Sequence, residues 1–178
     1  MSPDEAQLSA LFRQLYPALC RFLAVLLGDS ALAKDVAQEA FVRMHRFGAR
    51  RLPPDEARLW LFRVARNLAL NELKQRRVRG RILSSIAGWF RSHTDSPATA
   101  METAEASRRI TTYLRALPEH QRATVLLREL EAMSYAEIAR VLGVSQAKVR
   151  VDLHRARGAL REQRREAELQ PRRGRHGL

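Results

Sequence analysis

The chain has almost no cysteine and no clustered histidine, which argues against disulfides and metal sites. Cys20 is the only cysteine among 178 residues, so the chain has no internal disulfide and cannot build a cysteine-rich zinc site. Its five histidines are scattered along the sequence without the spacing of metal ligands. We therefore assign no metal and no cofactor.

Long apolar runs and strand patterns are also missing. The longest apolar run, Phe22 to Leu27, is far too short to cross a membrane, and Asp4 and Glu5 replace the positive start of a signal peptide. We therefore expect a cytoplasmic protein without stable membrane insertion. Patterns typical of strands are sparse, whereas apolar residues recur at spacings of three and four in two long blocks. This periodicity predicts an all-α fold.

Acidic residues are outnumbered by basic ones. The chain has 32 Lys and Arg against 19 Asp and Glu, a net charge of +13 at pH 7. Such a charge attracts phosphate polyanions and speeds association with them. Nucleic acid is the partner class that fits best, and an anionic membrane surface is the alternative.

A change in composition divides the chain. Residues 78–106 contain two glycines, a proline and many Ser, Thr and Ala, which is the composition of a linker, with one apolar island around Trp89 and Phe90. The island is consistent with a short docking helix or with an amphipathic plug in the connector. The predicted parts are a helical domain at 1–77, a flexible linker at 78–106, a second helical domain at 107–161 and a basic tail at 162–178.

The second domain contains the pattern of a helix-turn-helix. Ser134 stands three residues before Glu137, the spacing of a capping box at the start of a helix. Gly143 ends that helix because it accepts a left-handed backbone, Val144 is expected to fill the angle between the helices, and Ser145 caps the next helix. The predicted inner face of this next helix consists of Val149, Leu153, Ala156 and Leu160.

The second helix of a helix-turn-helix places its N-terminal part in the major groove, where exposed side chains contact bases and phosphates. The candidates on this helix are Gln146, Lys148, Arg150, Val151 and His154. An ordinary helical hairpin with a solvated basic face is the alternative.

A helix predicted at about 30–47 has two different faces. One face is an apolar stripe, and the other carries Asp35, Gln38 and Glu39 at positions i, i+3 and i+4. Judged from these residues alone, the acidic patch is more often a solvated face, in which Glu39 pairs with Arg43 one turn later.

The next helix, predicted from about Glu56 to Arg77, has an unusual outer face. One stripe combines an aromatic ring, cations and amides: Trp60, Arg63, Asn67, Asn71 and Lys74. A tryptophan stacks on an unpaired base, amides read base edges, and cations hold the backbone. In the alternative, Trp60 belongs to the core and the rest is polar surface. The preceding loop adds the cations Arg46, Arg50 and Arg51.

Four motifs follow one another as Asp35-x-x-Gln38-Glu39, Trp60-Leu-Phe-Arg-Val-Ala-Arg-Asn67, Leu117-Pro118 and the helix-turn-helix ending Leu153-His-Arg-Ala-Arg157. Together they closely resemble bacterial sigma factors of the extracytoplasmic-function class, over residues 8–77 and 107–161. The resemblance implies a subunit without catalytic residues that binds core RNA polymerase and directs it to promoters. It also implies control by an anti-sigma protein, for which Trp89 and Phe90 are a candidate contact.

The resemblance assigns a role to each surface. It implies that Asp35, Gln38 and Glu39 contact the clamp helices of the largest catalytic polymerase subunit. A second set of side chains would recognise the minus-ten element and help to melt it: Arg50, Arg51, Trp60, Arg63, Arg66, Asn67, Asn71 and Lys74. A third set would read the minus-thirty-five element as duplex: Ser145, Gln146, Lys148, Arg150, Val151, His154 and Arg155.

One position departs from the family pattern. Asp152 stands where the family commonly has a basic residue, and a carboxylate there is expected to repel phosphate unless Lys148 or Arg155 neutralises it. On that argument, Asp152→Arg strengthens DNA binding by the second domain.

Two other functions compete with this one. A conventional regulator would bind promoter duplex tightly without core polymerase and use its first domain for dimerisation or sensing. A nucleic-acid enzyme would need carboxylates or histidines clustered for metal or acid–base chemistry, and the acidic residues here are dispersed over helix faces. The sequence therefore predicts a sigma factor and not an enzyme.

Overall fold

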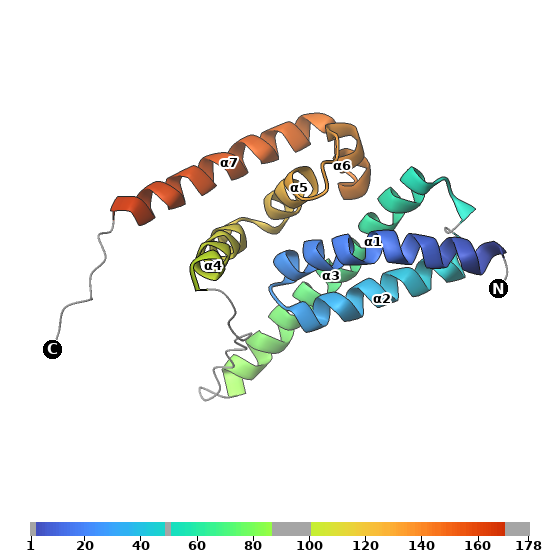
Figure 1. Cartoon of the computed structure of the whole chain (residues 1–178). Helices are drawn as coiled ribbons and strands as arrows, with labels where there is room; N and C mark the ends of the chain where they lie inside the picture. The colour runs from blue at the N-terminus through green and yellow to red at the C-terminus, as the bar shows by residue number, and fades with distance from the viewer. Residues whose placement is uncertain (1–2, 49–50, 87–100, 170–178) are drawn as a thin grey trace. The chain divides into compact units, whose positions relative to one another are not determined.

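All the regular structure in the described part of the chain is helical, which confirms the all-α prediction (Figure 1). The computed structural model describes residues 3–48, 51–86 and 101–169, and side chains at 6–48, 51–78 and 109–169. The chain divides into two compact units, Met1–Ser107 and Arg108–Leu178.

The first unit is a bundle of three helices, α1 (Pro3–Leu27), α2 (Ser30–Arg46) and α3 (Pro54–Ile86), each of which contacts the other two. Its core is built from apolar residues at helical spacing, and Phe22 and Phe62 are both fully buried. Their rings pack edge to face with centroids 5.5 Å apart and join α1 to α3. This packing fixes which face of α3 is left for solvent.

Helix α1 is apolar enough to span a membrane by length and composition, with a mean hydropathy of 1.4 over Ala6–Leu27. A search for uninterrupted apolar runs overlooks it because Arg13 and Arg21 break the sequence. In the structure Leu19 and Phe22 have no exposed surface, and the helix packs against α2 and α3. The apolar side chains of α1 thus form the core of the first unit.

Helix α2 begins at a cap that is also tied to α3. The Asp29 carboxylate accepts a hydrogen bond from the Leu32 amide at 3.0 Å and another from the Arg76 guanidinium at 2.8 Å. The Leu32 amide and, next, Arg76 hold the pKa of Asp29 below its usual value. Asp29 therefore links the start of one helix to the side of another.

We expect Asp29→Ala to lower the free energy of unfolding of the first unit by about 1 kcal/mol at pH 7, because a helix cap is lost. The pKa of Asp29 is lower in the folded chain, so its contribution is complete above pH ~4 and is lost as the pH falls through the folded value. Urea unfolding followed by tryptophan fluorescence measures this, since both tryptophans precede Arg108. Asp29→Asn, which keeps a cap, should lose less; an equal loss in both variants would contradict the capping argument.

Helix boundaries near the predicted linker and tail differ from expectation. Helix α3 continues to Ile86 instead of ending near Arg77, and α4 (Met101–Ala116) begins inside the segment predicted as linker. The linker composition of residues 78–106 suggested a helix end, but a glycine such as Gly80 costs a helix only about 1 kcal/mol. Helix α7 (Gln146–Leu169) likewise runs into the segment predicted as a tail. Trp89 and Phe90 lie outside the described residues.

The second unit contains α5 (Glu119–Glu129), α6 (Tyr135–Leu142) and α7. Helix α7 contacts both of the others, and Val149, Leu153 and Ala156 on its inner face are buried. Leu160, predicted to share this face, is only partly buried. The three helices are the helix-turn-helix and the helix that supports it.

Local hydrogen bonds fix the start of α6 and of α7 as the sequence predicts. The Ser134 hydroxyl accepts from the Glu137 amide at 3.2 Å, and the Glu137 carboxylate accepts from the Ser134 amide at 2.7 Å. The Ser145 hydroxyl accepts from the Lys148 amide at 3.2 Å. These caps set where each helix begins.

The turn between α6 and α7 departs from expectation in one detail. Gly143 has the predicted left-handed backbone, with φ of 68°. Val144, expected between the helices, is instead 37% exposed. Its amide donates to the Ala139 carbonyl at 3.0 Å, the hydrogen bond that closes a helix ended by glycine. This closure leaves the Val144 side chain at the surface.

Candidate functional site

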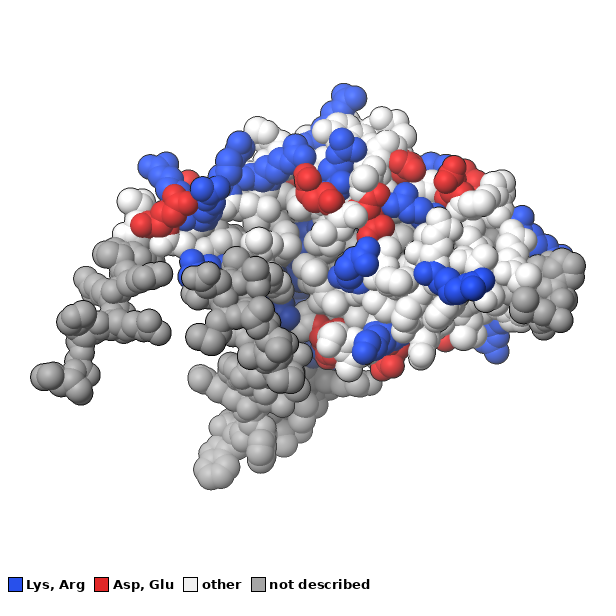
Figure 2. Space-filling model, in the orientation of Figure 1, with Lys and Arg blue, Asp and Glu red and all other residues white. Residues whose placement is uncertain are grey.

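Helix α7 presents a basic surface. All its predicted contact residues are exposed: Ser145, Gln146, Lys148, Arg150, Val151, His154 and Arg155. Lys148, Arg150 and Arg155 make its first turns basic. Figure 2 shows further cations, with some carboxylates among them, at the upper left of the view, where Figure 1 draws the C-terminal half of α7. The N-terminal part of this helix therefore has the exposure and the charge that a major-groove reading helix needs.

Arg150 lies against an aromatic ring that the sequence did not single out. Its guanidinium carbon is 6.0 Å from the centroid of the Tyr135 ring, and that of Arg128 is 5.4 Å from the same centroid. Arg128 also donates to the Met133 carbonyl at 2.8 Å. Since these partners come from different helices, only the folded chain shows that Tyr135 restrains Arg150.

A further ion pair fastens α7 to the end of α5. The Arg157 guanidinium donates to the Glu129 carboxylate at 2.8 Å. This hydrogen bond raises the pKa of Arg157 above its usual value. Arg157 is therefore engaged within the protein, and the reading surface of α7 lies nearer its N-terminus.

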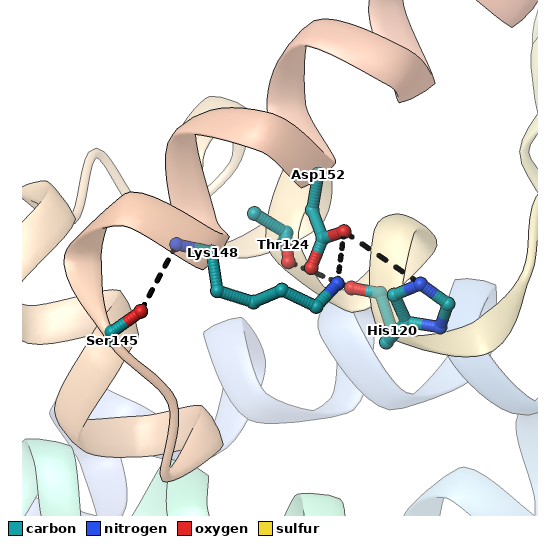
Figure 3. Close-up of polar contacts among 5 residues, drawn as sticks. All are labelled: His120, Thr124, Ser145, Lys148 and Asp152. Carbon is teal, nitrogen blue, oxygen red and sulfur yellow. Dashed lines mark hydrogen bonds and ion pairs between the residues drawn. The ribbon is translucent and has the colours of Figure 1, made fainter.

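Asp152 is buried, with 2% of its surface exposed, which corrects its expected place on the DNA-facing surface. Its carboxylate accepts a hydrogen bond from the Lys148 ammonium and lies 3.7 Å from Nε2 of His120 (Figure 3). The side chain points toward α5, and Lys148 neutralises it. The expected repulsion of phosphate therefore has no basis in the structure.

The stripe on α3 faces solvent. Arg63, Asn67, Asn71 and Lys74 are exposed, while Trp60 and Arg66 are half-buried. The adjacent residues Leu61 and Phe62 are fully buried and hold this part of α3 to the bundle. Trp60 is thus neither wholly core nor wholly surface. In the preceding loop Arg51 is exposed, and Arg50 lies outside the described residues.

The acidic patch lies on the outer face of α2. Asp35 and Gln38 are exposed, whereas Glu39 accepts a hydrogen bond from Arg43 at 2.7 Å. Glu39 and Arg43 also line an open hollow of about 540 Å³ together with Arg46 and Phe47. Phe47 is 76% exposed and was not singled out from the sequence. Its exposed ring gives this end of α2 an apolar contact beside the charges.

Comparison with known proteins decides the family. Residues 11–79 match sigma-70 region 2, and residues 107–160 match sigma-70 region 4. The chain is 30% identical to the ECF RNA polymerase sigma factor SigM of Bacillus subtilis, over 79% of this chain and 85% of that protein. The chain belongs to the extracytoplasmic-function sigma factors. It is also 33% identical to the ECF sigma factor SigL of Mycobacterium tuberculosis, over 89% of each protein.

Solved structures of two other proteins share the fold of this sigma factor. The sigma factor RpoE of Bartonella quintana, in complex with the anti-sigma factor NepR, has a TM-score of 0.67 at 24% identity, covering 86% of this chain and 94% of that one. CnrH, in complex with the cytosolic domain of CnrY, has a TM-score of 0.63 at 25% identity, covering 89% and 88%.

As an ECF sigma factor, the chain is a transcription initiation factor and not an enzyme. It binds RNA polymerase and promoter DNA. Within the described residues, no group of three or more His, Cys, Asp or Glu side chains is placed to hold a metal ion.

Proposed function

We propose that the sigma factor divides promoter recognition between its two units. The first unit binds core polymerase through α2 and recognises and melts the minus-ten element through α3. The second unit binds the minus-thirty-five element through α7. Two surfaces of different chemistry support this proposal. One is a half-buried tryptophan among exposed amides and cations on α3, and the other is the exposed basic face of α7 in the helix-turn-helix.

The α3 stripe suits unpaired bases. Trp60 is half-buried, so part of its side chain is held by the bundle and part is accessible for stacking with an extruded base. Asn67 and Asn71 follow on the same face and carry the donors and acceptors that read a base edge. Arg63 and Lys74 supply positive charge for the strand that carries those bases.

Helix α7 suits a duplex. Its first two turns expose Gln146, Arg150 and Val151, a combination that hydrogen-bonds base edges and contacts thymine methyl groups. Tyr135 restrains Arg150, which lowers the entropy lost when that guanidinium binds a base. These features support sequence-specific reading by the second unit.

Helix α2 is the proposed contact with core polymerase. Asp35 and Gln38 are exposed, and Glu39 lines the same open hollow as the exposed Phe47. Exposed aromatic rings are enriched in protein interfaces, and complementary charges at their rim steer the partner into place. On a chain with a net charge of +13, this patch also differs in sign from the surfaces proposed to bind DNA.

We also infer that an anti-sigma protein controls this factor and that it works in the cytoplasm. The inference is supported by the shared fold with a sigma factor that was solved in complex with the anti-sigma factor NepR. The proposed partners, core polymerase and chromosomal DNA, are found in the cytoplasm.

The decisive test combines core binding with run-off transcription from a pool of promoter fragments. We expect Asp35→Ala/Glu39→Ala to weaken core binding about thirtyfold, because two charged contacts of about 1 kcal/mol each are lost. The matched control is Glu166→Ala/Glu168→Ala, which removes the same charge and breaks a similar pair, Arg164–Glu168 at 2.8 Å, on α7. Equal core binding by both double variants would place the polymerase contact elsewhere on the chain.

A further inference from the structure

Two helices bring two basic side chains to a single carboxylate oxygen in the second unit. Lys148 lies in the first turn of α7 and His120 in the first turn of α5. Both approach Oδ1 of Asp152: the Lys148 ammonium donates a hydrogen bond to it, and Nε2 of His120 lies 3.7 Å away (Figure 3). We call these three residues the Asp152 cluster.

The burial of Asp152 keeps the cluster together. An unpaired buried carboxylate is strongly unfavourable, so Lys148 remains beside Asp152. Below His120, the buried Thr124 hydroxyl donates to the His120 carbonyl at 2.7 Å, one turn along α5. Most exposed lysines lose side-chain freedom when they bind a ligand, but Lys148 has already lost it on folding.

The basic groups of the cluster face solvent while the acidic group lies beneath them. The Lys148 side chain is 44% exposed and that of His120 is 47% exposed, against 3% for Asp152. An ammonium has three N–H donors, and Asp152 uses one of them. The Lys148 donors that remain, together with the exposed part of the imidazole, offer two neighbouring contacts to an anion.

A backbone phosphate is the anion that this position fits. The first turn of a recognition helix enters the major groove, and side chains on its flank meet the phosphates at the groove wall. Lys148 turns along its helix toward Asp152 and α5, so its ammonium lies on that flank. Arg150, by contrast, lies on the other side of α7, against Tyr135 of α6.

We propose that Lys148 and His120 hold one backbone phosphate of the minus-thirty-five duplex, with Asp152 as the positioning residue that keeps them together. This inference rests on the proposed binding of that element by α7. It makes Lys148 a phosphate contact and leaves base reading to Gln146, Arg150, Val151 and His154. The Asp152 cluster thereby sets how deep and at what angle α7 enters the groove.

The test uses holoenzyme reconstituted from the full chain and core polymerase, and a promoter duplex that this holoenzyme selects from a random pool. Each phosphate near the minus-thirty-five element is replaced in turn by a neutral methylphosphonate, and affinity is measured. We expect one position to weaken wild-type binding about tenfold, the cost of a lost charge-assisted contact. In His120→Ala and Lys148→Ala the same replacement should cost little further, and the dependence of affinity on salt should weaken in Lys148→Ala.

Two further variants separate the role of the cluster from general effects. Arg150→Ala is the matched control and should remain fully sensitive to the same methylphosphonate. Asp152→Asn, which keeps the side-chain shape, should lose part of that sensitivity because the two side chains are no longer held. Since His120 is exposed, His120→Ala should fold normally. It therefore still tests the phosphate site if Lys148→Ala destabilises the second unit.

The outcomes are distinguishable. A selected duplex whose phosphate sensitivity is unchanged in His120→Ala and Lys148→Ala would overturn the phosphate site and leave the proposed function standing. Failure to select any duplex with a minus-thirty-five element would instead overturn the proposed function of the second unit.

Discussion

Trp60→Ala is expected to lower the yield of open promoter complexes about ten- to a hundredfold, because stacking of one base on an aromatic ring is worth about 1 to 3 kcal/mol. The half-buried position of Trp60 supports this expectation, since part of the side chain is accessible to solvent and therefore to a base. Binding of core polymerase should not change, because Asp35 and Glu39 lie on a different helix.

A fluorescent base analogue in the minus-ten element measures melting directly. Trp60→Tyr is the matched variant, because it keeps an aromatic face and should retain most of the open-complex yield. A small effect of Trp60→Ala on melting, together with a large loss of thermal stability, would assign Trp60 to the core instead. The two readings of this residue that the sequence left open are thus separated by one pair of variants.

Local signals made part of this structure predictable. The capping box of Ser134 and Glu137 and the left-handed backbone of Gly143 depend on residues close in sequence, and both are present as predicted. The exposed face of α3 also follows from helical periodicity, because Arg63, Asn67 and Asn71 repeat at spacings that share one side of a helix. The order of these motifs along the chain resembles that of a known family, and this resemblance predicted the function.

Features that depend on tertiary packing were not predictable from the same signals. Periodicity places Asp152 beside buried positions on α7, but only the fold shows that α5 brings His120 to it. The contact of Arg128 and Arg150 with Tyr135 likewise joins three different helices. The end of α3 was misplaced for another reason. The boundary was inferred from a change in composition, and composition is too weak a signal to stop a long helix.

Asp152→Arg is expected to destabilise the second unit by about 3 kcal/mol or more, which is a typical cost of breaking a buried ion pair. The change places a guanidinium at a site with 2% exposure, where it has no carboxylate partner and lies next to the Lys148 ammonium, a charge of the same sign. An argument from the net charge of a recognition helix alone predicts a different result, namely that Asp152→Arg strengthens DNA binding.

Hydrogen exchange of peptides from α5 to α7 in the full chain measures the destabilisation. The matched control is Lys148→Met/Asp152→Leu, which removes both charges and fills their volume with apolar atoms; its stability should stay near that of the wild type, because a buried ion pair is often no more stable than well-packed apolar residues. Unchanged exchange in Asp152→Arg, with tighter binding to duplex DNA, would show that the carboxylate reaches solvent and repels phosphate after all. Loss of protection in Asp152→Arg but not in the double variant would show that Lys148 is needed because Asp152 is a buried charge. The charges on this helix would then be determined by packing within the second unit and not by DNA binding.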